Sequence, residues 1–461
     1  MVAVFFVAPG PADAAPALNG TAMNWPWALP FAGILLSIAT GPLLFPKIWH
    51  DHYGKIAVAW SLLTLTPIAI VFGSSTALAA LVHAALAEFM SFIILLFALY
   101  VVAGGILITG DLRGTPWTNT SIMVLGTAMA SVVGTTGAAM ILVRPLIRAN
   151  ASRAHNAHVV VFFIFLVANI GGALSPLGDP PLFVGFLRGV DFFWTTKHIA
   201  YETAIVAALV LAIFIALDVW FARKESAPPE VARAPLRLRG LINIPLIAAI
   251  VGAILLSAAW KPGITLTIHG TGVELQNLTR DAALVVIALV SLWLTPDEHR
   301  VANDFTWEPI REVAKLFAGI FVCIIPMLAM LDAGYDGPFA WLLKAVTEKD
   351  GTPNEVAYFW LTGVLSAFLD NAPTYLVFFQ LAGGDAAELM GKLAPTLAAI
   401  SMGAVYMGAL TYIGNAPNFM VYAIATERGV KMPSFFGYLL WSSAVLLPVL
   451  LLLTFVFVAK P

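Results

Sequence analysis

Two acidic residues lie in long uncharged stretches, each beside residues that interrupt a helix. Asp370 has 14 uncharged residues on either side and is followed by Asn371 and Pro373. Asp179 follows Gly178 and precedes two prolines. A charged side chain at mid-membrane depth costs about 2.5–3.5 kcal/mol on insertion scales, so such residues are functional by default. Burial favours the neutral form of a carboxyl group, so each acid could hold a proton or a cation, one at a time.

Polar side chains and helix-breaking residues surround both acids. Hydroxyls, amides and carbonyls freed at a helix break are hard oxygen donors, and helix N-termini add a partial positive charge. We therefore expect the two acids to accept Na⁺ or H⁺ and their polar neighbours to complete the shell. The expected ion-binding residues are Asp179, Asp370, Thr135, Thr136, Ser175, Asn371, Thr374, Thr411, Asn415 and Asn418, and the expected helix-break positions are Gly134, Gly137, Gly178, Pro180, Pro373, Gly414 and Pro417.

These motifs recur with one spacing. Gly134 precedes Gly178 by 44 residues (178 − 134), and Asp370 precedes Gly414 by 44 residues (414 − 370). An offset of 236 residues therefore places both motifs of the first half on those of the second. Paired interrupted segments at corresponding positions point to the binding site of a secondary transporter. Proline kinks that only shape a helix bundle are the alternative, and they suit a lone proline better than four motifs in register.

The elements that must position these residues are membrane helices. Of the 461 residues, 60% are hydrophobic and 11% are charged, whereas soluble domains carry about 25% charged residues. Uncharged runs such as 56–87, 114–143 and 432–459 exceed the roughly 20 residues that a membrane helix needs. The runs are continuously apolar, unlike the alternating strands of a membrane barrel. The fold is therefore an all-α polytopic membrane protein, and soluble enzymes and nucleic-acid binders are excluded.

The pattern predicts about 10–11 transmembrane helices in two inverted repeats, each with a re-entrant hairpin and a broken helix. Residues 223–239 hold five Lys or Arg and form a basic loop that we place in the cytoplasm. Five passes separate the two hairpins, and because five is odd, the hairpins enter from opposite faces. The expected segments are an extracytoplasmic or signal-like stretch at 1–24, one transmembrane domain at 25–461, repeat 1 at about 75–222 and repeat 2 at about 314–458.

Other charged residues receive simpler interpretations. Arg144 could neutralise an acid or bind an anion, but we expect it to lie at the interface at the base of the first hairpin. Glu88 is expected at a membrane interface, although contact with the site is an alternative. Asp218 lies within reach of Arg223 and is expected to pair with it at a helix end. The single cysteine, Cys323, excludes an internal disulfide.

The motif from Asn169 to Pro181 (NIGGALSPLGDPP) and the matching motif from Gly414 to Asn418 (GNAPN) resemble the ion transporter superfamily. Within it, the sequence is most similar to NhaD-like sodium:proton antiporters and citrate transporter-like proteins. The resemblance spans roughly 80–430. It implies re-entrant hairpins, elevator-type transport and a homodimer, with ions held at the hairpin tips and broken helices. The anion symporters of the superfamily carry Ser-Asn-Thr at both tips, and this chain does not, which favours a cation.

We therefore expect a secondary transporter that exchanges Na⁺ for H⁺ across a bacterial inner membrane, with Na⁺ at Asp179 and Asp370 and no cofactor. No G-x-x-x-x-G-K-[ST] motif is present, so ATP does not drive it directly. The alternative is a cation-coupled symporter of citrate or another carboxylate anion. The other expected partners are the lipid bilayer and a second copy of the chain, without nucleic acid. Two other classes of protein remain as alternatives. An intramembrane enzyme would need a nucleophile and a base, or metal ligands, in the core. A channel would pass a current that does not saturate and cannot be driven against a gradient.

Overall fold

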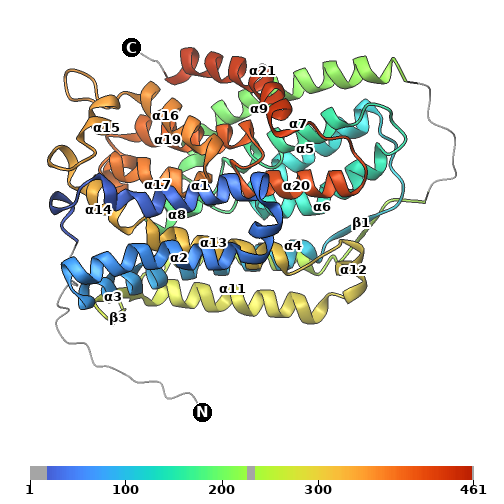
Figure 1. The fold of residues 1–461 in the computed structure, drawn as a ribbon. Coiled ribbons are helices and arrows are strands. Elements are labelled where there is room, and N and C mark those ends of the chain that lie inside the picture. Colours follow the sequence, from blue (N-terminus) through green and yellow to red (C-terminus); the bar gives the residue numbers. More distant parts are fainter. Residues whose placement is uncertain (1–17, 226–233, 459–461) are drawn as a thin grey trace.

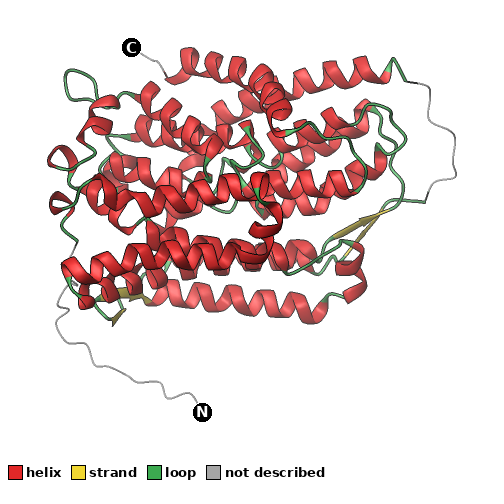
Figure 2. Ribbon diagram, viewed as in Figure 1, coloured by secondary structure: helices red, strands yellow, loops and turns green. Residues whose placement is uncertain are grey.

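A computed structural model describes residues 18–225 and 234–458. These residues form a bundle of helices that run mostly along one common direction, with two short strand pairs at its ends (Figures 1 and 2). The predicted all-α membrane architecture is confirmed. Most of the expected N-terminal stretch and residues 226–233 of the basic loop lie outside the described residues.

Seven helical segments among the described residues are long and apolar enough to cross a membrane: Trp25–Leu44, Pro46–Phe72, Ser74–Gly104, Trp194–Ala222, Leu275–Leu294, Glu308–Asp332 and Phe435–Val458. Helix α10 (Asn243–Ala259) and the broken helices described below are shorter. Counting α10 and the two broken helices with those seven gives ten passes within the described ranges. The five passes expected between the hairpins are all present.

The first half contains a helix pair that turns back inside the bundle and a helix that is interrupted midway. Helices α5 and α6 meet at Gly134, and α7 is separated from α8 by a 3₁₀ turn and an irregular stretch. The bounds are α1 (Leu29–Leu44), α2 (Pro46–Phe72), α3 (Ser74–His83), α4 (Met90–Gly104), β1 (Leu107–Thr109), α5 (Pro116–Val133), α6 (Thr135–Ala149), α7 (Ala157–Leu166), α8 (Pro180–Leu187) and α9 (Trp194–Ala222). A π-helical turn, Ala84–Phe89, joins α3 to α4.

The second half repeats this order. Helices α16 and α17 meet at Asp370, and α19 is separated from α20 by a 3₁₀ turn and an irregular stretch. The bounds are β2 (Arg237–Arg239), α10, β3 (Thr265–Ile268), β4 (Thr271–Glu274), α11 (Leu275–Leu294), α12 (Asp297–Ala302), α13 (Glu308–Cys323), α14 (Ile325–Asp332), α15 (Ala340–Ala345), α16 (Glu355–Phe368), α17 (Asn371–Leu381), α18 (Ala386–Met390), α19 (Ala394–Met407), α20 (Ala416–Glu427) and α21 (Phe435–Leu453).

The element bounds follow the 236-residue offset. Adding 236 to α5 gives 352–369, against Glu355–Phe368 for α16. Adding 236 to α8 gives 416–423, against Ala416–Glu427 for α20. Helices α5 and α6 lie toward the end of the molecule that carries β1 and α12, whereas α16 and α17 lie toward the end that carries α15 (Figure 1). The two hairpins thus enter from opposite ends.

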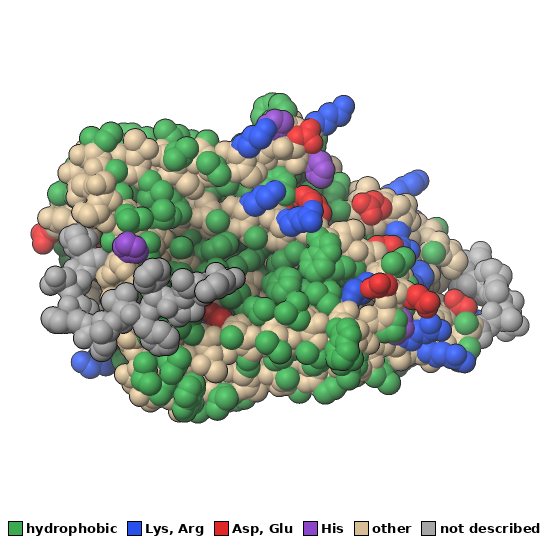
Figure 3. Space-filling view, turned by 90° about the horizontal axis from the view of Figure 1, so that it is seen from below, with side chains coloured by type: hydrophobic (Ala, Val, Ile, Leu, Met, Phe, Trp, Pro, Cys, Tyr) green, Lys and Arg blue, Asp and Glu red, His purple; other side chains and the backbone are tan. Residues whose placement is uncertain are grey.

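Two strand pairs mark the ends of the bundle. β1 pairs antiparallel with β2, which the sequence did not predict, because each strand has only three residues. β3 and β4 form a hairpin between α10 and α11. Figure 3 shows one side of the bundle, on which hydrophobic side chains cover the middle and most charged side chains gather toward one end. Exposed apolar residues such as Ile70 on α2 and Trp293 on α11 belong to the surface that faces lipid.

Candidate functional site

The four helix breaks meet in the centre of the bundle. The Thr135 N–H, at the tip of α5–α6, donates to the Gly178 carbonyl in the first broken helix at 2.8 Å. The Thr411 hydroxyl, in the second broken helix, donates to the Ala367 carbonyl at the end of α16. Non-helical backbone is tolerated at membrane depth only where protein buries it or it lines a cavity. These contacts supply that protection.

Glycines allow the chain segments to approach closely at each break. Gly134 has φ +81°, a conformation that glycine adopts without strain, and it ends α5 and begins α6. A Cβ atom on Gly178 would lie 2.1 Å from the Gly172 carbonyl oxygen. A Cβ atom on Gly414 would lie 2.5 Å from the Gly408 carbonyl oxygen. The first and second broken helices therefore use glycine pairs at positions related by the same offset.

The prolines of the motifs restart helices after the breaks. Pro180, Pro373 and Pro417 lie in the first turns of α8, α17 and α20, where a missing N–H removes no helical hydrogen bond. Asp179 and Asn415 have extended backbone just before α8 and α20. Their side chains are consequently free to point away from the helix that each precedes.

Asp179 is the centre of the polar cluster. Its side chain is buried, with 1% of its surface exposed. Oδ1 accepts hydrogen bonds from Thr135 Oγ1 at 3.2 Å and from Asn415 Nδ2 at 2.9 Å. Oδ2 accepts a hydrogen bond from Asn371 Nδ2 at 2.6 Å. One carboxylate thus joins both hairpin tips and both broken helices.

Two amide oxygens beside Asp179 have no partner. Asn371 Oδ1 and Asn415 Oδ1 are buried and accept no hydrogen bond. Buried polar atoms are nearly always satisfied, so an orphaned oxygen calls for an explanation such as an unseen ion. A carboxylate, two amides and a hydroxyl form an oxygen donor set for a hard cation. No group of three or more His, Cys, Asp or Glu side chains that could hold a metal occurs among the described residues.

Asp370 occupies the tip of α16–α17 and is partly buried. One of its carboxylate oxygens accepts the Ala372 N–H at 3.1 Å, so the side chain caps α17. It lines the same cavity as Asp179, without a direct hydrogen bond between the two acids. A capping carboxylate that also faces a cavity can take up a second positive charge.

The hydroxyls predicted from the sequence divide into two groups. Thr135 contacts Asp179, and Thr136 lines the cavity. Ser175 donates to the Ser131 carbonyl, Thr374 donates to the Asp370 carbonyl at 2.9 Å, and Thr411 donates to Ala367 as described above. These three therefore hold backbone at the helix breaks. The Ser175 and Thr411 contacts are equivalent under the offset, because both span 44 residues.

Asn169 was not among the predicted site residues. Its Nδ2 donates to Asn418 Oδ1 at 2.7 Å, and its Oδ1 accepts Asn415 Nδ2 at 3.3 Å. Asn418 Nδ2 in turn donates to the carbonyls of Gly408 and Thr411. Asn169 thus connects the two broken helices next to Asp179. Its place at the head of the recognised motif was the signal that could have identified it.

A cavity of about 500 Å³ leads from this cluster toward the end of the bundle that carries α12. Gly134, Gly137, Gly178 and Pro417 are among its lining residues. Its acidic lining residues are Asp179, Asp304, Glu308, Glu312, Asp370 and Glu427, and its one Arg or Lys is Arg144. The side chain of Asp304 is 56% exposed, so the cavity reaches the surface there.

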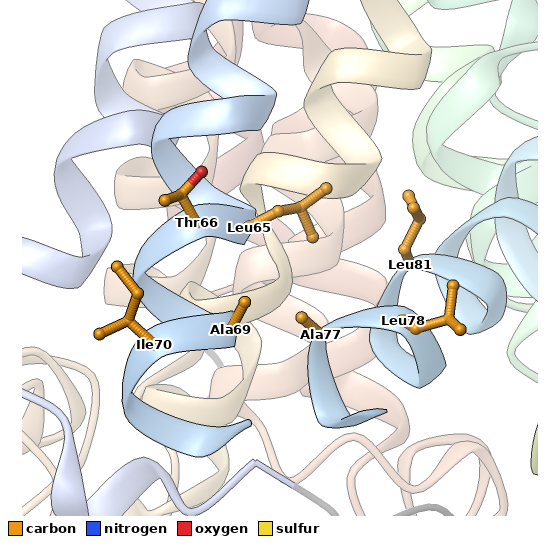
Figure 4. Close-up of a pocket in the computed structure, with 7 residues that line it drawn as sticks. All are labelled: Leu65, Thr66, Ala69, Ile70, Ala77, Leu78 and Leu81. Carbon is orange, nitrogen blue, oxygen red and sulfur yellow. The ribbon is translucent and has the colours of Figure 1, made fainter. Parts of the chain in front are cut away.

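The second hollow does not belong to this site. It lies between α2 and α3 and is lined by apolar side chains and Thr66 (Figure 4). Ile70, which lines it, is 78% exposed, so the hollow lies on the outer surface of the bundle. It is a gap between two helices at the lipid-facing surface.

The structure gives partners to three other charged residues, and for Asp218 the predicted partner is wrong. Arg144 is 6% exposed, and its Nε donates to Asp304 Oδ2 at 3.0 Å. Glu88 is 9% exposed and forms an ion pair with Arg188 at the end of α8. Asp218 does not pair with Arg223; it is fully buried and accepts hydrogen bonds from Arg153, His158 and Asn119. In each case a segment distant in sequence supplies the partner.

A family profile described as "Putative citrate transport" matches residues 20–458, nearly the whole chain. The chain belongs to this citrate transport family. Two curated mycobacterial relatives, from Mycobacterium bovis and Mycobacterium tuberculosis, are each 25% identical over 335 residues. The match covers 69% of this chain and 72% of each relative, and both are described as uncharacterized transporters. This member of the citrate transport family is therefore a multi-pass membrane transporter, and the expected family resemblance is confirmed.

Proposed function

We propose that the protein exchanges Na⁺ for H⁺ across the bacterial inner membrane. The observation that carries this proposal is buried Asp179, beside two amide oxygens that have no partner. The site lies where both hairpin tips and both broken helices meet. A single carboxylate there serves both ions, because bound Na⁺ favours the charged form and burial without Na⁺ favours the protonated form.

Rotation of two amides would accompany the exchange. Without a cation, the NH₂ groups of Asn371 and Asn415 donate to Asp179, as observed. With a cation, a half-turn of each amide presents its oxygen to the ion instead. The cation-bound state then gives a partner to both amide oxygens that have none in the observed arrangement, and the cation balances the charge of the carboxylate. Asp370 supplies a second acidic group at the same cavity.

The charge of the cavity favours cations. Six acidic residues and a single arginine line it, and a cleft lined by one sign of charge concentrates ions of the opposite sign. The cavity links Asp179 to the end of the molecule that carries α12. Positively charged loops favour the cytoplasmic side, and the basic segment around Arg237 and Arg239 lies at this end, next to β1. We place this end in the cytoplasm.

Transport requires the site to open toward the opposite end. The hairpins and broken helices, within repeats at about 75–222 and 314–458, would move together against α2, α4 and α13, as in an elevator. The Glu88–Arg188 ion pair joins α8 to the turn between α3 and α4, so it would break during this movement. The membrane-embedded unit would be a homodimer that acts without cofactor or catalysis.

A transport assay tests the proposal. The purified protein is reconstituted in liposomes that contain a pH-sensitive dye, and Na⁺, Li⁺ or K⁺ is added outside. The expected result is cation-dependent alkalinisation of the lumen, which disappears in Asp179→Asn and Asp370→Asn liposomes. An unchanged lumenal pH with all three cations, in vesicles shown to contain folded protein, would overturn the antiport proposal.

The family assignment supports a second candidate, a cation-coupled symporter of citrate or another carboxylate. Asp179 and Asp370 would then hold the coupling cation, and the carboxylate would bind elsewhere in the cavity. Uptake of labelled Na⁺ distinguishes the two: symport requires citrate in the outside solution, whereas antiport proceeds without it and depends on a pH gradient.

A further inference from the structure

An arginine cluster lies at the mouth of the cavity, separate from Asp179. Arg144 lies nine residues after Thr135 on the same helix, which places it about 13 Å farther along the helix axis. Arg428, just after α20, and Arg144 both contact Asp304 Oδ2, at 2.6 Å and 3.0 Å. Arg148 lies one turn beyond Arg144, on the same face of α6. Two guanidinium groups therefore share one carboxylate oxygen, whereas Arg148 donates to the Ile108 carbonyl at 2.9 Å.

Asp304 cannot satisfy this cluster alone. Arg144 Nη1 is buried and has no hydrogen-bond partner, although Arg144 lines the cavity. Arginine presents its donors as a planar fork that matches two oxygens of a carboxylate or phosphate. Asp304 accepts hydrogen bonds from both arginines with the same oxygen, Oδ2. A bidentate contact between an arginine and an anion would instead use two oxygens of the anion. The unpaired donor thus indicates an incomplete oxyanion site.

The chain itself holds Asp304 in this position. Asp304 is one of two non-glycine residues with positive φ in the described ranges, at +47°. The preceding residue, Asn303, is fixed by hydrogen bonds from its Nδ2 to the carbonyls of Gly104 and Ile106. The side chain of Asp304 is 56% exposed, so it can turn toward solvent without leaving a buried charge of its own.

We propose that Arg144 and Arg428 form a binding site for an oxyanion, which Asp304 occupies in the absence of ligand. An incoming carboxylate displaces Asp304 and engages the unpaired Nη1 of Arg144 at the mouth of the cavity. Because the present occupant is a carboxylate, small di- and tricarboxylates are the first ligands to examine. A lipid phosphate offers the same chemistry. The site does not depend on the exchange of Na⁺ for H⁺ at Asp179.

Binding is measured on the full-length protein in neutral detergent, by isothermal calorimetry and thermal shift, at constant ionic strength. Citrate, succinate and inorganic phosphate are the probes. We expect saturable binding in the wild type and its loss in Arg144→Gln. Arg239→Gln is the matched control, because it removes the same charge from exposed β2 at the same end of the bundle, and it should bind like wild type.

Removal of the internal competitor gives the sharpest test. Asp304→Asn and Asp304→Gly both suit a positive φ, so the loop keeps its conformation. If Asp304 fills the site about nine-tenths of the time, either variant should bind citrate about tenfold more tightly. A purely structural ion pair predicts lower stability and no tighter binding. Two independent variants keep the test valid if one of them does not fold.

The arms of the experiment separate the possible results. In one outcome, nanodiscs of anionic phosphatidylglycerol stabilise the wild type but not Arg144→Gln, while free anions do not bind. That result would support the site, with a lipid phosphate as its ligand. Absence of any Arg144-dependent anion effect in folded wild type and both Asp304 variants would overturn the proposal. Since these measurements involve no ion gradient, failure of Na⁺/H⁺ exchange in liposomes leaves their outcome unaffected.

Discussion

Replacement of Asp179 by Asn should separate ion binding from folding. The carboxylate accepts hydrogen bonds from Thr135, Asn371 and Asn415. In the variant, the amide oxygen can keep the bonds from Thr135 and Asn415. Its NH₂ group then faces Asn371, whose Oδ1 has no partner and becomes the acceptor once that amide turns over. Three hydrogen bonds are kept and the number of unpaired buried groups does not rise, so we expect a loss of about 1 kcal/mol or less in stability.

Ion binding should suffer far more. The substitution removes a unit charge in direct contact with the cation, and such a pair at about 4 Å is worth about 4 kcal/mol at an effective dielectric constant near 20. Since about 1.4 kcal/mol is a factor of ten, Na⁺ should bind about a thousandfold more weakly, and the exchange response should disappear at Na⁺ concentrations that saturate the wild type. The assay measures the lumenal pH response against Na⁺ concentration, together with the thermal unfolding midpoint in detergent.

Asp332→Asn is the matched control. Asp332 is an exposed acid at the end of α14, where it accepts a hydrogen bond from Gln380, and it is not among the residues that line the cavity. It should exchange ions like the wild type. Wild-type Na⁺ dependence in the folded Asp179→Asn variant would refute the assignment of Asp179 as the ion-binding group. A large fall of the unfolding midpoint would instead show that Asp179 is chiefly structural.

Other predictions concern the hairpin tip, the cavity mouth and the opposite end of the bundle. Gly134→Ala forces an alanine to φ +81° and ψ 151°, a region that essentially only glycine adopts, and should cost about 1–3 kcal/mol. Gly252→Ala, with open space around it, should not lower the unfolding midpoint. Equal midpoints would contradict the strain at the tip. The pKa of Asp304 lies below its usual value because, although burial raises it, two arginine partners lower it more. The stability from this contact is therefore present above about pH 4 and is lost as the pH falls through the lowered pKa. Loss of wild-type stability near pH 6, relative to Asp304→Asn, would contradict this ion pair. A double-mutant cycle on Glu88→Gln and Arg188→Gln should give a coupling energy between the two side chains above the roughly 0.2–1 kcal/mol of exposed ion pairs, because Glu88 is 9% exposed. Zero coupling energy in thermal melts would show that this ion pair does not stabilise the fold.

The contacts around the cluster indicate how the two ends of the bundle are linked. At one end, Asp304 joins the loop before α13 to α6 and to the residue after α20. At the other end, Arg188 joins α8 to Glu88. Both ion pairs connect the proposed moving elements to the surrounding helices. In the proposed elevator movement both pairs would break, so they would add to the energy barrier of that movement.

The amino-acid sequence alone determined which segments cross the membrane and where helices break. Uncharged runs identify spans because a bilayer has no water to solvate charges. Gly134, Gly178 and Gly414 mark breaks because they permit conformations or contacts that larger residues resist. One offset related the two halves, although the sequence predicted Ser175, Thr374 and Thr411 as ion-binding residues and the structure shows that they contact backbone carbonyls at the breaks. These features depend on local chemistry and on spacing along the chain.

Only the tertiary structure decided which side chains meet. Asn371 and Asn415 reach Asp179 across 192 and 236 residues, and Arg144 reaches Asp304 across 160 residues. Helical periodicity identifies the buried face of a segment but does not specify which neighbour packs against that face. For this reason the helix breaks were predicted correctly, whereas the partners of Arg144 and Asp218 were not. A long-range polar contact depends on how helices dock, and that arrangement leaves no local pattern in the sequence.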